Sequence, residues 1–145
     1  MSGYRVEKLS AVGQTRSVEM TVWVDSWQMQ CCGEPFTVGS EVSWTLREVE
    51  SGWLASVLGS GVAGTVDAAE EHHGGLSEET PVTRAKVSRI TAVHCRYAPR
   101  PGGESRTLYP VAGSAAISAV TSADGWTPAR DELAFVGYLV RIDIP

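Results

Sequence analysis

The sequence lacks the long apolar run that a membrane-spanning helix requires. Such a helix needs about 20 consecutive apolar residues, and no segment of the 145-residue chain approaches that length. Residues 1–10 also contain no apolar stretch of the kind that forms the centre of a signal peptide. We therefore expect a protein without a membrane partner, located in the cytoplasm.

Cysteine is scarce, and its number is odd. The chain has three cysteines, of which Cys31 and Cys32 are adjacent and Cys95 is far away in sequence. Secreted domains that depend on a disulfide framework usually carry an even number of spaced cysteines. The pattern indicates three reduced thiols.

Positive charge is also in short supply, because the formal net charge is -5. This argues against a general nucleic-acid binder, which usually carries a clear excess of positive charge. The charge is uneven: acidic side chains dominate residues 34–79, and basic side chains dominate residues 84–106. This pattern is typical of two differently charged solvated faces. A basic strand face that meets an acidic partner is the sharper alternative.

Apolar residues are plentiful, at 43% of the chain, and five tryptophans stand among them. A chain of this length and composition predicts one globular domain over residues 1–145. Alternation of apolar and polar residues, with many β-branched side chains, predicts a series of strands. These cover residues 18–27, 42–47, 85–97, 106–111, 117–120 and 135–142. Val87 and Ile90 break the alternation, which suggests a β-bulge or a strong twist.

One segment has helical spacing instead. Trp53, Leu54, Val57 and Leu58 predict a short helix over residues 52–58, ended by Gly59. Residues 59–83 are rich in glycine and acid, and we expect a long, flexible loop insertion there. Together these features predict an all-β fold. We expect a small SH3-like or related barrel with one short helix and a long acidic loop insertion.

Three stretches of the chain resemble a known family. They are WVDSWQMQCCGEPFTVGSEVSW (residues 23–44), AEEHHGG (69–75) and ITAVHCRYAPRPGG (90–103). The first is similar to the WVDxWQMQCCGxPF signature of an actinobacterial, Streptomyces-type family of unknown function. The resemblance implies a bacterial cytoplasmic protein and supplies no catalytic residues.

Candidate metal ligands occur in separated pairs. They are Cys31, Cys32, His72, His73 and His94. Zinc requires four such ligands in a tetrahedron, but no CxxC spacing is present, and adjacent strand residues point to opposite faces. The same cysteines could serve a thiol-dependent enzyme if a histidine lay beside them. We expect a protein that needs no cofactor, with a zinc site and a thiol-dependent enzyme as the two alternatives.

The tryptophans give a different hypothesis. Trp23 and Trp27 fall opposite the valines of the first predicted strand, and flat rings beside amides and arginines can hold a ligand. The predicted ligand-binding residues are Trp23, Trp27, Gln28, Gln30, Phe36 and Arg96. The competing interpretation is that the helix at 52–58 packs on these rings. We favour a non-enzymatic binding or interaction module whose partner is an unknown protein or small molecule.

Overall fold

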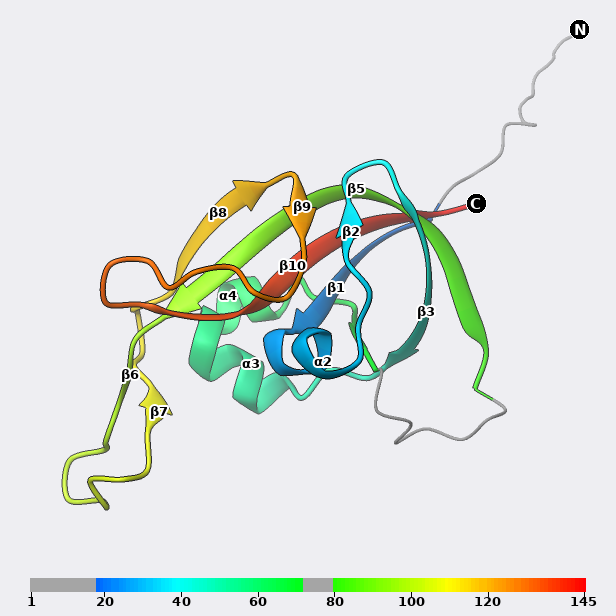
Figure 1. The fold of residues 1–145 in the computed structure, drawn as a ribbon. Helices are drawn as coiled ribbons and strands as arrows, with labels where there is room; N and C mark the ends of the chain where they lie inside the picture. The colour runs from blue at the N-terminus through cyan, green and yellow to red at the C-terminus, as the bar shows by residue number, and fades with distance from the viewer. Residues whose placement is uncertain (1–17, 72–79) are drawn as a thin grey trace, which may run out of the picture.

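The computed structural model describes residues 18–71 and 80–145 (Figure 1). Its strands are β1 (Val18–Asp25), β2 (Phe36–Thr37), β3 (Glu41–Arg47), β4 (Ala68–Glu70), β5 (Val82–Cys95), β6 (Tyr97–Ala98), β7 (Tyr109–Pro110), β8 (Ala116–Val120), β9 (Ser122–Ala123) and β10 (Ala134–Ile144). Its helices are α2 (Ser26–Cys31), α3 (Ser51–Leu58) and α4 (Ser60–Ala63). Within these ranges, no helix is both long enough and apolar enough to span a bilayer.

Five strands close into a barrel, which confirms the predicted mainly β barrel class. The strand order is β10-β1-β4-β3-β5, and β5 pairs with β10 to close the ring (Figure 1). Strand β5 is long enough to pair with β10 along one edge and with both β3 and β8 along the other. Pairing of β1 with β4 is parallel, and the other barrel pairs are antiparallel. The SH3-like subtype stays a prediction.

The bulge expected in β5 is present. Arg89 pairs with Arg141 and Val87 pairs with Ile142, so that Ser88 is one extra residue on the β5 side. An extra residue reverses the alternation of side chains beyond it. Val87 and Ile90 are therefore both buried in the same core despite their sequence spacing.

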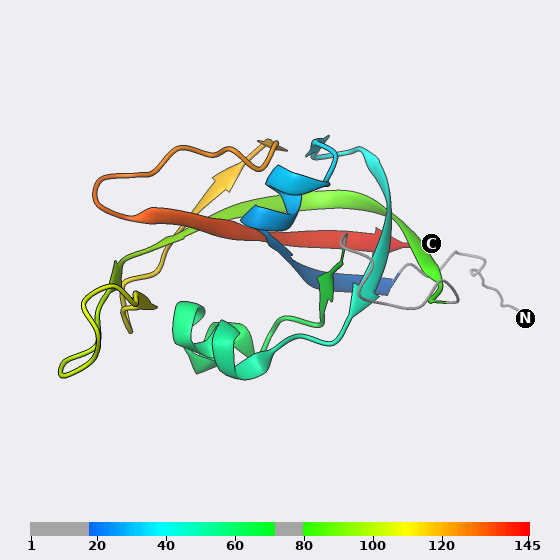
Figure 2. The same cartoon turned by 60° about the horizontal axis from the view of Figure 1, so that its bottom comes forward.

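Apolar side chains form two separate cores. The first fills the barrel and includes Val22, Val24, Tyr138 and Val140. The second lies between the outer wall of the barrel and the helices α3 and α4, which sit together on one side (Figure 2). Its members are Trp23, Leu54, Val57, Leu58, Ala63, Val66, Ala69, Val93, Cys95 and Val136. Strand β1 thus contributes one face to each core.

Three sequence-based expectations need correction. The first strand ends at Asp25 rather than residue 27, because Ser26–Cys31 form the helix α2. The chain has more than one short helix, since α4 follows α3 directly. The predicted loop insertion at 59–83 contains α4 and the barrel strand β4, and residues 72–79 of it lie outside the described residues.

The remaining elements agree more closely with the sequence. Helix α3 matches the predicted helix at 52–58, and β3, β5, β8 and β10 match predicted strands within a few residues. The strand expected at 106–111 is reduced to the two residues of β7, paired with β6.

Gly137 generates a prediction about stability. A methyl group added there would lie 2.5 Å from the carbonyl oxygen of Val24 and 2.7 Å from the ring of Trp23. We expect Gly137→Ala to lower the free energy of unfolding by about 1–3 kcal/mol, because overpacking forces neighbours to shift. Urea unfolding of the parent and the variant measures this difference. Gly52→Ala is the control, since nothing lies within 4 Å of a methyl group there; equal losses in both variants would contradict the packing argument.

Candidate functional site

A cavity of about 290 Å³ lies on the outer wall of the barrel, beside α3. Its lining comes from strands β1, β3 and β4, from the helices α2 and α3, and from the segment that precedes α3. The lining residues are Trp23, Asp25, Trp27, Arg47, Val49, Glu50, Trp53, Leu54 and Ala69. We call this the tryptophan cavity. It combines aromatic walls with charged side chains of both signs.

Strand alternation explains why these side chains meet. Val22 and Val24 belong to the core inside the barrel, so Trp23 and Asp25 point outward from the same strand. Ala69 on β4 pairs with Trp23 on one side and with Arg47 on the other. The small side chain of Ala69 between two large ones leaves the floor of the cavity open.

The three tryptophans of the cavity differ in exposure. Trp23 is only 3% exposed, while Trp53 is 37% exposed and Trp27 is 54% exposed. The rings of Trp23 and Trp53 lie 5.9 Å apart between centroids, tilted by 59°. Trp23 therefore anchors the outer core, and Trp27 and Trp53 present accessible aromatic surface.

Asp25 is the carboxyl group most affected by the cavity. Burial raises its pKa above the usual value, while the indole N–H of Trp23 and the charge of Arg47 oppose the rise. The N–H of Trp23 is buried and falls short of a well-formed hydrogen bond to any partner. A carboxyl group and an indole donor thus face each other with incomplete hydrogen bonding.

Arg47 is held by neighbours. Its Nε lies 3.5 Å from a carboxylate oxygen of Glu71, and both side chains are largely buried. Its Nη1 also donates to the carbonyl oxygen of Glu48 at 3.1 Å. The positive charge of Arg47 is therefore balanced locally by Glu71.

Glu70 lies on the other side of the barrel wall. It alternates with Ala69 along β4 and pairs with Leu46, whose side chain packs against the interior core. Burial is the main reason that the pKa of Glu70 rises to about 8, with repulsion from Glu71 adding to it. At neutral pH this carboxyl group is mostly protonated, and it does not line the tryptophan cavity.

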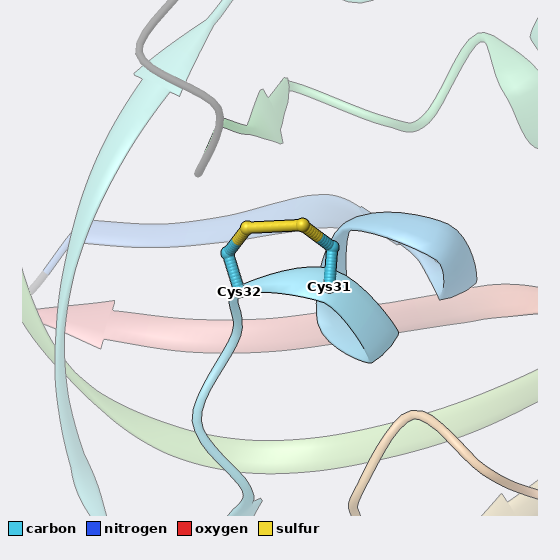
Figure 3. The surroundings of a disulfide bond; sticks show 2 residues. All are labelled: Cys31 and Cys32. Atoms are coloured by element: carbon cyan, nitrogen blue, oxygen red, sulfur yellow. A yellow bond between two sulfur atoms is a disulfide. The ribbon is translucent and has the colours of Figure 1, made fainter.

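The cysteines differ from expectation. Cys31 and Cys32 are joined by a disulfide at the end of α2 (Figure 3), and both residues are exposed. The prediction of three reduced thiols is wrong for this pair, because the turn at the end of the helix brings the two adjacent sulfur atoms together. Cys95 is free and buried, and burial raises the pKa of its thiol.

Two of the six predicted ligand-binding residues, Trp23 and Trp27, line the tryptophan cavity. Gln28 follows Trp27 on α2 but is buried. Gln30 donates from its side-chain amide to the carbonyl oxygen of Gly125 at 2.8 Å. The amide of Gln30 therefore supports the position of α2, and neither glutamine lines the cavity.

The other two predicted residues lie elsewhere. Phe36 is buried in the interior core, with its ring edge against Trp44 at 5.2 Å between centroids. Arg96 is exposed just after β5, and its backbone N–H donates to the hydroxyl of Ser114. Neither residue lines the tryptophan cavity.

Sequence reasoning assigned only two of the nine lining residues to the site, and the seven that it missed include Asp25, Arg47 and Trp53. Asp25 could have been found, because it shares the outward face of β1 with Trp23. Arg47 and Trp53 come from elements far along the chain, and their approach depends on the pairing of β4 between β1 and β3. No local pattern reveals that pairing.

The metal candidates do not converge in the described part of the chain. Over residues 18–71 and 80–145, no group of three or more His, Cys, Asp or Glu side chains could hold a metal ion. His94 is buried, with its Nε2 at 2.9 Å from the carbonyl oxygen of Pro128. His72 and His73 lie outside the described residues.

Comparison with known proteins gives one match. A model described as a family of unknown function, DUF6578, matches residues 18–144. No curated protein and no solved structure matches the chain significantly.

Glu70 predicts a pH-dependent stability. Because its pKa is raised, the folded protein holds the proton more tightly than the unfolded chain does. The contribution of Glu70 to the free energy of unfolding should therefore be fully present below about pH 4.5 and be lost as the pH rises through about 8. Glu70→Gln should remove this decline. At alkaline pH its free energy of unfolding should exceed that of the parent by a few kcal/mol, since one pKa unit corresponds to about 1.4 kcal/mol.

Urea unfolding at several pH values between 5 and 9 tests this, with the exposed Glu48→Gln as a matched control. Parallel stability curves for the parent and Glu70→Gln would contradict the assignment.

The disulfide predicts a thiol count. Protein purified without reductant and then unfolded should show one reactive thiol, that of Cys95, and three after reduction. Titration with a chromogenic thiol reagent measures both values. Three thiols before reduction would show that Cys31 and Cys32 are not joined.

Proposed function

We propose that this chain, which belongs to the DUF6578 family of unknown function, acts as a non-enzymatic binding module. The ligand occupies the tryptophan cavity. The observation that carries this proposal is the convergence of three indole rings with Asp25 and Arg47 around one hollow. Ligand pockets typically combine apolar and aromatic walls with a few fixed polar groups.

The exposure of the rings supports binding over packing alone. Packing against α3 accounts for Trp23, which is buried in the outer core. It does not account for Trp27 and Trp53, which keep 54% and 37% of their surfaces exposed around the same hollow. Exposed aromatic surface grouped in one place is a common mark of recognition sites.

The size of the cavity limits the ligand. At about 290 Å³, it is at the small end of ligand pockets, which start at roughly 300 Å³. The ligand is therefore a small molecule, or one side chain of a partner protein, rather than an extended peptide.

Several finer points belong to the same proposal. They are the actinobacterial origin, the SH3-like subtype of the barrel, the cytoplasmic location and the signature at residues 23–36. That signature includes Trp23, Asp25 and Trp27, all of which line the cavity.

A catalytic role is the second candidate, and one observation favours it. The pKa of Asp25 is raised inside a cavity, which is a property that general acids and bases share. If the site is catalytic, Asp25→Asn should abolish turnover of a bound substrate. If the site only binds, the same variant changes affinity alone.

The binding proposal predicts opposite behaviour for two exposed tryptophans. Trp27→Ala should weaken the binding of a cavity ligand by about 5- to 150-fold, since stacking on one ring is worth about 1–3 kcal/mol. It should leave the fold intact because Trp27 is half exposed. Trp126→Ala, at a residue 65% exposed and outside the cavity lining, should change nothing.

The measurement is a screen of small fragments, in which binding is detected by NMR from shifts of the indole N–H signals. Ligands should shift the signals of Trp23 and Trp53 and leave that of Trp126 unchanged. A Trp27→Ala protein that fails to fold would support a purely structural role for this ring.

A further inference from the structure

We infer that the tryptophan cavity binds a methylated ammonium group, as in a quaternary ammonium compound. The inference rests on the binding function proposed above and adds the chemical class of the ligand. It is carried by three indole rings and an excess of acidic side chains around one small hollow.

The rings come from three different elements and surround the cavity. Trp23 projects from β1, Trp27 from α2 and Trp53 from α3. The rings of Trp23 and Trp53 contact each other, with centroids 5.9 Å apart and planes tilted by 59°. Trp23 therefore backs the cavity, and Trp53 and Trp27 supply the accessible aromatic surface. An indole face carries negative potential, and tryptophan is the aromatic side chain that attracts cations most strongly.

The charges around the cavity also favour a cation. Asp25 and Glu50 line the cavity, and Arg47 is the single basic residue in the lining. The charge of Arg47 is balanced by Glu71 at 3.5 Å. An anionic ligand would meet two carboxylates and an arginine that is already paired.

Asp25 gives independent support. Burial makes its ionised form costly, which is why its pKa is raised. A cation bound nearby would offset that cost, and the attraction would be strong because the site is partly removed from water. A positive group bound in the cavity would therefore stabilise the ionised form of Asp25.

Methylation follows from the nature of the walls. A primary ammonium is strongly hydrated and needs several hydrogen-bond acceptors when it leaves water. A quaternary ammonium donates no hydrogen bonds and places methyl groups against aromatic faces, which is how aromatic cages recognise choline and methylated lysine. The indole rings in the lining supply the apolar faces that such methyl groups contact, which favours the methylated group.

Calorimetric titration with three matched probes tests the inference. Choline carries the quaternary ammonium, 3,3-dimethylbutan-1-ol is its neutral isostere, and ethanolamine carries a primary ammonium. We expect choline to bind at least tenfold more tightly than either of the others. Equal binding of choline and the neutral isostere would overturn the inference.

The outcomes separate this inference from the binding function. If the neutral isostere binds as well as choline and shifts the Trp23 and Trp53 indole signals, the cavity binds ligands but has no preference for cations. If only sugar-like or anionic fragments bind, the cation inference again fails alone. If no fragment of any class binds, both proposals fail.

Charge-removing variants give a second test. Glu50→Gln should weaken choline binding several-fold and leave binding of the neutral isostere unchanged, because Glu50 is exposed and lines the cavity. Asp25→Asn should have the larger effect, since its carboxyl is more buried. Glu48→Gln removes the same charge from an exposed neighbour outside the lining, and an equal loss there would show a general surface effect that contradicts the inference.

The same chemistry could come from a free metabolite or from a methylated side chain of a partner protein. Free trimethyllysine and a short peptide that contains it distinguish these sources when titrated in parallel. Equal affinity indicates a free small molecule, and tighter binding of the peptide indicates a partner protein. Failure of both to bind would count against the inference.

Discussion

The burial of β1 on both faces is the constraint on which the rest of the structure depends. Val22 and Val24 fill the barrel, while Trp23 turns outward and packs under α3. The outward ring needs room, which Gly137 on β10 and Ala69 on β4 supply by having little or no side chain. Because these neighbours are small, the barrel wall can carry a large aromatic residue on its outside and leave a hollow beside it.

This arrangement also explains the unusual electrostatics of the region. Strand β4 is three residues long, so Glu70 at its end is forced inward while Glu71 follows on the outside. Arg47 pairs with Glu71, and its charge lowers the pKa of Asp25 and of Glu70 by less than burial raises them. Burial therefore dominates the titration of both carboxyl groups.

Local patterns were sufficient for much of the fold. Alternation located β3, β5 and β10, helical spacing located α3, and the broken alternation at Val87 and Ile90 located the bulge at Ser88. The helix α2 was not predicted because Trp27 continues the alternating pattern of the strand before it. Strand β4 escaped because Ala-Ala-Glu has little intrinsic strand preference, and it is set by pairing with β1 and β3. The candidate site could be predicted only in part for the same reason. Trp23 and Trp27 are close in sequence, but Arg47 and Trp53 reach them only through that pairing.

The division of the cavity between two kinds of segment bears on how such a protein can evolve. Trp23 and Ala69 belong to the closed barrel, and changes there disturb its closure or its outer core. Trp27, Glu50 and Trp53 project from segments outside the barrel strands. Mutations in those segments can alter the shape and charge of the hollow while the strand pairing stays as it is. The shape and charge of the hollow can therefore change through exposed positions that lie outside the strand pairing of the barrel.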